Sequence, residues 1–148
     1  VARLRRRFDY IFEGQHGYPT LCEIKPLGMR LLAGFALAWV EMPHGPTTST
    51  GLRFEADGAA VAYATDFSEI TAEMADCFAG ADLLVSDCLK REPHPTHAHL
   101  AMALELKART GARRMVLTHL DKTMDYRTLS AEVPKGVEVG YDGLEWRS

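Results

Sequence analysis

Three short apolar runs in this sequence each end in a side chain that can bind a metal ion or transfer a proton. The runs and their end residues are 115–117 with His119, 60–64 with Asp66, and 83–85 with Asp87. Apolar runs of this length, bounded by glycine or charged residues, predict buried strands of a covered sheet. In layered α/β folds, ligands bind at the edge where such strands end. A single polar strand end that faces solvent is an equally good interpretation, but three together favour a common site.

The remaining patterns predict an α/β (α+β) fold in which strands come first and helices then alternate with strands. The expected strands are 7–12, 20–24, one or two within 31–42, 51–55, 60–65, 83–86, 115–118, 137–139 and 144–146. The expected helices are 69–78, 97–110 and 125–132. Ser68 and Thr96 are the expected N-caps of the first two helices. No repeat or linker divides the sequence, so residues 1–148 should form a single unit.

The composition limits the classes of protein to which the chain can belong. It has 148 residues, 47% of them hydrophobic, which is enough for one compact core. A net charge of -3 and a pI near 6.1 weigh against nucleic acid as a partner. No apolar run approaches the roughly 20 residues that span a membrane. The cysteines include no C-x-x-C pair, which argues against a disulfide scaffold and suits a cytoplasmic protein.

His44, Asp66 and His119 are the strongest candidates for metal ligands. Neutral imidazole and carboxylate are the groups that divalent ions such as zinc or manganese select. A carboxylate can bridge two ions and an imidazole cannot, so Asp66 is the natural bridge between two metal ions. Two ions about 3.5–4 Å apart can activate a water and stabilise a phosphoryl oxyanion. Three residues alone fall short of two complete coordination shells.

Two further histidines, His97 and His99, open a predicted helix. Residues two apart do not share a helix face, so at most one of them should point at the site. A helix N-terminus disfavours charged imidazole and favours phosphate. His97 is therefore a candidate acid–base or phosphate-contacting residue. The alternative is that both residues only cap the helix or face solvent.

Asp87 and Asp142 are candidates for carboxylates that orient ligand histidines from behind. The alternative is that each is a strand-end or turn carboxylate satisfied by nearby backbone N–H groups. Cys88 directly follows a predicted strand, where it is best interpreted as a small buried hydrophobic residue.

These residues lie in motifs that resemble a known family. The motifs are His44-Gly45, Tyr63-Ala64-Thr65-Asp66, Val85-Ser86-Asp87-Cys88, His97-x-x-Leu100, Leu117-Thr118-His119 and Val139-Gly140-Tyr141-Asp142-Gly143-Leu144-Glu145. In this succession the chain resembles the metallo-β-lactamase-fold hydrolases. Within them it is most similar to the phosphonate-pathway cyclic phosphodiesterases, which open 5-phosphoribosyl 1,2-cyclic phosphate. The resemblance covers essentially the whole chain, but only the second half of the family's domain.

The resemblance implies a fold and a set of site residues. The fold would be the C-terminal half of an αββα sandwich, a mixed sheet with helices on one face. His44 would be a metal ligand, Asp66 the bridging ligand and His119 the last ligand. His97 would be the acid–base residue that protonates the leaving oxygen. The family usually has an acidic or small polar residue where this chain has His99, which leaves the choice between His97 and His99 open.

The resemblance also implies a function for the intact protein: a metal-dependent phosphodiesterase with two zinc or manganese ions. Its substrate would be a small cyclic phosphate ester, opened by attack of metal-activated water. The family's His-x-His-x-Asp-His cluster occurs nowhere in this sequence. We therefore expect a fragment that lacks the N-terminal half of the domain and is inactive alone.

Two alternatives to the phosphodiesterase stay open at this point. One is a nuclease or lactamase-type hydrolase of the same superfamily, and the other is a non-catalytic module completed by another chain. In either case, the sheet face that would pack against the missing half should be bare and apolar. Such a face favours homodimerisation, swapping or aggregation.

Overall fold

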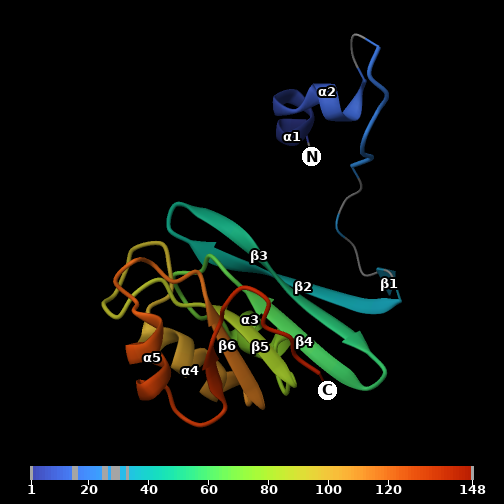
Figure 1. The fold of residues 1–148 in the computed structure, drawn as a ribbon. Coiled ribbons are helices and arrows are strands. Elements are labelled where there is room, and N and C mark those ends of the chain that lie inside the picture. Colours follow the sequence, from blue (N-terminus) through green and yellow to red (C-terminus); the bar gives the residue numbers. More distant parts are fainter. Residues whose placement is uncertain (1, 15–16, 25–26, 28–30, 33, 148) are drawn as a thin grey trace.

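A mixed seven-stranded sheet organises the chain (Figure 1). The computed structural model describes residues 2–14, 17–24, 27, 31–32 and 34–147. The strands are β1 (Leu31–Leu32), β2 (Phe35–His44), β3 (Thr47–Ala56), β4 (Ala59–Ala64), β5 (Leu83–Asp87), β6 (Arg114–Thr118) and β7 (Val137–Val139). They lie side by side in chain order; β1 to β4 are antiparallel, and β4 to β7 are parallel. The expected α/β fold with a mixed sheet is confirmed.

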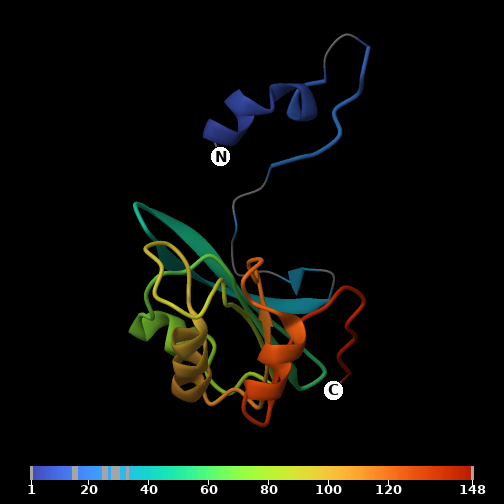
Figure 2. The same ribbon diagram turned by 60° about the vertical axis from the view of Figure 1, so that its left-hand side comes forward.

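Three helices pack on one face of this sheet, as Figure 2 shows from a second direction. They are α3 (Ala72–Cys77), α4 (Leu100–Thr110) and α5 (Tyr126–Glu132). The strands present a row of aligned small and apolar residues to them: Ala62, Leu84, Met115 and Val137. Phe78, Leu106 and Leu129 from the helical layer are fully buried in the same core. Burying such side chains, each worth about 1.5–3 kcal/mol, fixes the helices on this face.

The opposite face of the sheet is also apolar but only partly covered. Trp39, Leu52, Tyr63, Val85 and Val116 form one aligned row across it. The segment 140–147 lies over the parallel half of this face and lines a groove there with Tyr141, Leu144 and Trp146. Over the antiparallel half, Trp39 and Tyr63 keep 43% and 42% of their surface exposed. The expected bare face is therefore found on the side of β2 to β4.

The first residues form helices, not the expected strand at 7–12. They make α1 (Ala2–Arg7) and α2 (Asp9–Phe12), which stand away from the sheet in Figures 1 and 2. Phe8 and Phe12 are four residues apart, a spacing that fits one face of a strand and one face of a helix alike. The expected strand 20–24 is wrong as well. The backbone N–H of Leu21 donates to Ile11 O (2.9 Å), which packs that segment beside α2.

Two helices start later than the sequence predicts. Thr71 caps α3 by accepting from the N–H of Met74 (3.2 Å), because the hydroxyl of Ser68 instead donates to Pro43 O (3.3 Å). The first residue of α4 is Leu100, whose N–H donates to Lys90 O (2.9 Å). This bond keeps the residues before Leu100 extended, so the expected helical start at 97 is wrong.

The C-terminal segment contributes no further strand. The expected strand 144–146 is irregular backbone, although the turn before it is present, with Leu144 N–H donating to Tyr141 O (3.1 Å). Among the described residues, no helix is long and apolar enough to cross a membrane.

Replacing Gly51 by alanine should destabilise the fold. A Cβ at this position would lie 2.5 Å from Cζ of Phe78 and 2.8 Å from Sδ of Met42, both in fully buried side chains. Overpacking of this kind costs about 1–3 kcal/mol. We expect Gly51→Ala to lower the free energy of unfolding by that amount in a urea titration. Thr50→Ala, at an exposed neighbouring position, should change it by less than about 0.5 kcal/mol. Equal effects of the two substitutions would contradict this packing.

Candidate metal centre

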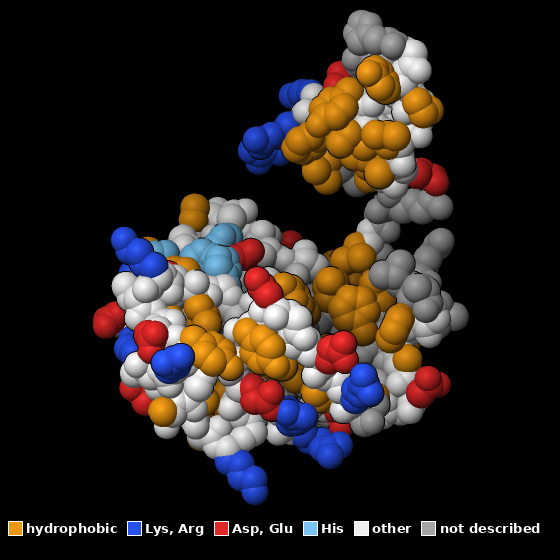
Figure 3. All heavy atoms as spheres, in the orientation of Figure 1, with side chains coloured by type: hydrophobic (Ala, Val, Ile, Leu, Met, Phe, Trp, Pro, Cys, Tyr) orange, Lys and Arg blue, Asp and Glu red, His pale blue; other side chains and the backbone are white. Residues whose placement is uncertain are grey.

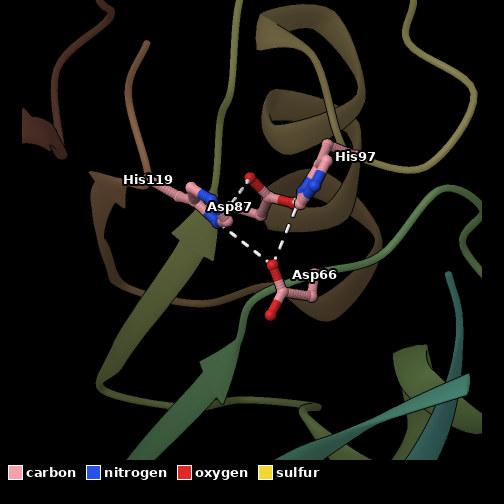
Figure 4. A group of neighbouring side chains, drawn as sticks. All are labelled: Asp66, Asp87, His97 and His119. Carbon is pink, nitrogen blue, oxygen red and sulfur yellow. Dashed lines mark hydrogen bonds and ion pairs between the residues drawn. The ribbon is translucent and has the colours of Figure 1, made fainter.

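The carboxyl ends of three parallel strands bring the predicted residues to one edge of the sheet. Ala64 of β4 is aligned with Ser86 of β5, and Ser86 with Leu117 of β6. The next residues along each strand therefore emerge together. Asp66, Asp87 and His119 converge there with His97, as Figure 4 shows. One ligand-type atom from each of these four residues lies within 4.8 Å of all the others. We call this group the four-residue cluster.

Asp66 and His119 reach the cluster from a strained backbone. Their φ angles are 62° and 60°, in the left-handed region that non-glycine residues seldom adopt. This conformation costs roughly 1–2 kcal/mol per residue. It is fixed at Asp66 by the hydroxyl of Ser49, which donates to Asp66 O at 2.7 Å. Strain held in place by such contacts concentrates at functional sites.

Asp87 forms the buried floor of the cluster. Its side chain is fully buried, and Oδ2 accepts from Nδ1 of His97 at 2.9 Å and from the N–H of Ala98 at 3.3 Å. Oδ1 accepts no hydrogen bond among the described residues, and Nδ1 of His119 lies 3.7 Å from it. An unpaired carboxylate oxygen in the interior is costly. A bound cation would remove that cost.

The two histidines of the cluster face the carboxylates with the same nitrogen. Nδ1 of His119 lies 3.1 Å from Oδ1 of Asp66, and Nδ1 of His97 lies 3.5 Å from the same oxygen. The ring centroids of His97 and His119 are 4.7 Å apart. Asp66 and His119 are 42% exposed, so one side of the cluster is open to solvent. Figure 3 shows the His side chains gathered at one corner of the body, with acidic side chains beside them.

His44 lies next to the cluster but is not one of its members. Its ring centroid is 4.8 Å from that of His97. Its Nδ1 lies 2.6 Å from the carbonyl oxygen of Thr96, which can only accept, so Nδ1 carries the proton. In the neutral ring this leaves a lone pair on Nε2, the form in which imidazole binds metals. The ligand role predicted for His44 needs that atom.

Two other predicted residues lie outside the cluster. His99 is the N-cap of α4 without capping through its side chain, and its Nδ1 is buried without a partner among the described residues. Between His97 and His99, only His97 belongs to the four-residue cluster. Asp142 is exposed and belongs to no candidate cation-binding group of the described residues.

The sequence analysis gave no role to His94, yet the structure places its ring beside the cluster. Its centroid is 5.5 Å from that of His97. The signal that could have found it is its position between Pro93 and Pro95, three residues before His97. Flanking prolines restrict the backbone of this residue and so limit the conformations of the loop that carries it.

The residues present fit a divalent metal ion. Imidazole and carboxylate groups, the side-chain types gathered here, are the donors that zinc-type ions select. Donor atoms within 4.8 Å of one another need only small shifts to surround an ion at about 2.0–2.2 Å. The unpaired Oδ1 of Asp87 points to the same conclusion. The individual roles of His44, Asp66, His97 and His119 stay predictions.

Comparison with known families agrees with this geometry. The β-lactamase superfamily domain matches residues 1–120. The chain belongs to that superfamily. The family expected from the sequence motifs is thereby confirmed. No curated protein sequence matches the chain significantly.

Several solved structures share the fold. A diphosphatase from the PhnP family is 29% identical, with a TM-score of 0.80 over 95% of this chain and 52% of that one. YhfI from Bacillus subtilis, a metallo-β-lactamase fold protein, is 20% identical, with a TM-score of 0.75 over 96% of this chain and 62% of that one. The short form of human tRNase Z is 19% identical, with a TM-score of 0.61 over 75% of this chain and 42% of that one. The chain therefore spans little more than half the length of the first two.

Asp87→Asn should weaken metal binding while the protein stays folded. The carboxylate accepts from His97 and contributes negative charge to the cluster, and an amide would lose that charge. Loss of such a group typically lowers metal affinity by about 10- to 100-fold. Competition of the complete polypeptide with a chromophoric zinc chelator measures this. Asp142→Asn, at an exposed carboxylate outside the cluster, should leave the affinity unchanged. Wild-type affinity in Asp87→Asn would show that the buried carboxylate does not support a metal.

Cys88, the cysteine beside the cluster, should be inert to thiol reagents in the folded protein. Burial, and next the negative charge of Asp87, raise the pKa of its thiol to about 12. At pH 8 only about one molecule in ten thousand would carry the reactive thiolate. Cys22 is exposed and should react readily. Labelling followed by mass spectrometry should therefore modify Cys22 first and Cys88 only after unfolding. Equal labelling rates would contradict the burial of Cys88.

Proposed function

We propose that this chain provides the C-terminal half of a metal-dependent phosphodiesterase. The observation that carries the proposal is the four-residue cluster at the carboxyl edge of a β-lactamase-superfamily sheet. The 29% identity to a PhnP-family diphosphatase supports phosphoester chemistry over other hydrolyses. The substrate we propose is a small cyclic phosphate ester, such as 5-phosphoribosyl 1,2-cyclic phosphate.

The proposed site would hold two divalent ions, zinc or manganese, in the intact protein. His44, Asp66 and His119 would be the ligands from this chain. Such ions polarise a phosphoryl group and lower the pKa of water. The chain's own contribution is to hold these ligands in place on three strand ends. A rigid sheet edge is well suited to this, because small displacements of catalytic groups are costly.

His97 is the residue we propose as the general acid. Its Nδ1 lies 2.9 Å from the fully buried carboxylate of Asp87, which accepts the Nδ1 proton. In the doubly protonated ring, the imidazolium, the proton that can be transferred is then on Nε2. From there it would pass to the oxygen that leaves phosphorus. Asp87 acts as a positioning residue, because it fixes the ring orientation of His97 without touching the substrate.

Another half-domain completes the proposed enzyme. The four-residue cluster and His44 supply fewer donors than two full coordination shells require. The apolar face with exposed Trp39 and Tyr63 offers a surface against which that half could pack. In its absence the same face would favour self-association. The whole enzyme would act in the cytoplasm.

A nuclease is the second candidate function. Human tRNase Z shares the fold over 75% of this chain. The net charge of -3 argues against it, because nucleic-acid backbones are bound by basic surfaces. Cleavage of RNA but not of cyclic phosphodiesters by the complete protein would favour this alternative.

His97→Ala should slow the hydrolysis of substrates that need a proton on the leaving oxygen. We expect kcat to fall by about 10²- to 10⁴-fold with an alkyl cyclic phosphodiester in the complete protein. With bis(p-nitrophenyl) phosphate the fall should be much smaller, because nitrophenolate leaves without protonation. Metal content should stay the same. The control is Glu92→Gln, at an exposed position on the same loop, which should match wild type.

Two results would contradict the acid role of His97. If kcat fell equally with both substrates, the effect of His97→Ala would not depend on protonation of the leaving oxygen. A loss of bound metal in His97→Ala would identify His97 as a ligand instead.

A further inference from the structure

We propose that His94 is a substrate-positioning residue, whose Nε2–H donates a hydrogen bond to a phosphoryl oxygen at the metal centre. The inference rests on the proposed function, because it needs a phosphoester at this site. It adds a residue outside the four-residue cluster and outside the predicted ligands.

His94 lies close enough to act at the site. Its ring is 5.5 Å from that of His97, centroid to centroid, and the two planes are inclined at 41°. The side chain is partly buried, so it is neither a free surface histidine nor a core residue. A group on substrate that contacts His97 is therefore within reach of the neighbouring imidazole.

Hydrogen bonds from Thr96 define which nitrogen of His94 carries the proton. The backbone N–H of Thr96 can only donate, and it lies 3.4 Å from Nδ1 of His94. The hydroxyl of Thr96 lies 3.3 Å from the same atom. Nδ1 is therefore the acceptor, and the proton of the neutral ring is on Nε2. No described residue accepts a hydrogen bond from Nε2 of His94.

The same residue gives His44 the opposite tautomer. The carbonyl oxygen of Thr96 can only accept, and Nδ1 of His44 donates to it at 2.6 Å. Nε2 of His44 thus has a lone pair for a cation, whereas Nε2 of His94 has a proton for an anion. The C=O and the N–H of Thr96 thus set different tautomers in two histidines, one suited to bind a cation and the other an anion.

The loop that carries His94 is held in place. Pro93 and Pro95 restrict its backbone on both sides. Thr96 packs tightly against the β2–β3 turn, since a Cβ added at Gly45 would lie 2.5 Å from Cγ2 of Thr96. A donor fixed before the substrate arrives contributes more than one that must be ordered on binding.

A phosphoryl group is the ligand that this donor fits. The four-residue cluster contains two carboxylates, which repel an anion unless cations and N–H donors offset them. His94 adds such a donor without adding a further carboxylate. Hydrogen bonds from N–H groups to charged oxygens are stronger than neutral ones, so this contact would orient the phosphoryl group.

The test compares two substitutions of nearly equal size in the complete, zinc-loaded protein. The side-chain amide of His94→Gln places an N–H near the position of Nε2, whereas that of His94→Asn reaches only the position of Nδ1. We expect His94→Asn to weaken binding of inorganic phosphate about tenfold, measured by calorimetry. His94→Gln should stay within about threefold of wild type. KM for a cyclic phosphodiester should rise in His94→Asn more than kcat falls, with zinc content unchanged.

Several outcomes would overturn the proposal. They are wild-type phosphate affinity in His94→Asn, equal losses in both variants, no phosphate binding by the wild type, and a fall in zinc content. Phosphate binding that depends on His94 in a protein that hydrolyses no phosphoester would support the His94 contact and overturn only the proposed phosphodiesterase.

Discussion

The contact on which the site depends is the hydrogen bond from His97 to the buried carboxylate of Asp87. A fully buried carboxylate is costly unless it is paired, so this side chain requires partners. His97 and the N–H of Ala98 satisfy one oxygen, and the other faces His119. The bond therefore links the end of β5 to the segment before α4. It determines both the ring orientation of His97 and the position where that segment ends.

The sheet provides the rest of the geometry through its parallel half. Strands β4, β5 and β6 end at one edge, and the polar residue that follows each apolar run is delivered to the same place. Helices α3 to α5 cover the inner face and bury Met115 and Leu117. The core thus ends within one or two residues of the site. Core residues and site residues are therefore close neighbours at this edge, so a substitution in the core should also affect the geometry of the site.

Strand-end logic indicated which side chains meet at one sheet edge better than pattern analysis placed the helix starts and the N-terminal elements. Apolar runs, turn residues and the order of elements were sufficient to place the strands from β2 to β7 approximately. Alternation failed at 7–12, because Phe8 and Phe12 are four residues apart and fit one face of a strand and one face of a helix alike. His97 was a predicted site residue, but its extended backbone was missed, because the hydrogen bond from Leu100 N–H to Lys90 O cannot be read from the sequence and delays the start of α4. His94 was missed because the flanking Pro93 and Pro95, although visible in the sequence, restrict the backbone without showing which way the loop folds.

The left-handed backbone at Asp66 and His119 has an evolutionary consequence. At these two positions the polypeptide would relax with glycine, and the ligand-type side chain would be lost. A library selected only for heat resistance should therefore enrich glycine at both sites and yield robust but chemically silent proteins. At these two residues, thermal stability favours glycine and chemistry favours a ligand-type side chain. Random substitutions that improve one property there would therefore reduce the other.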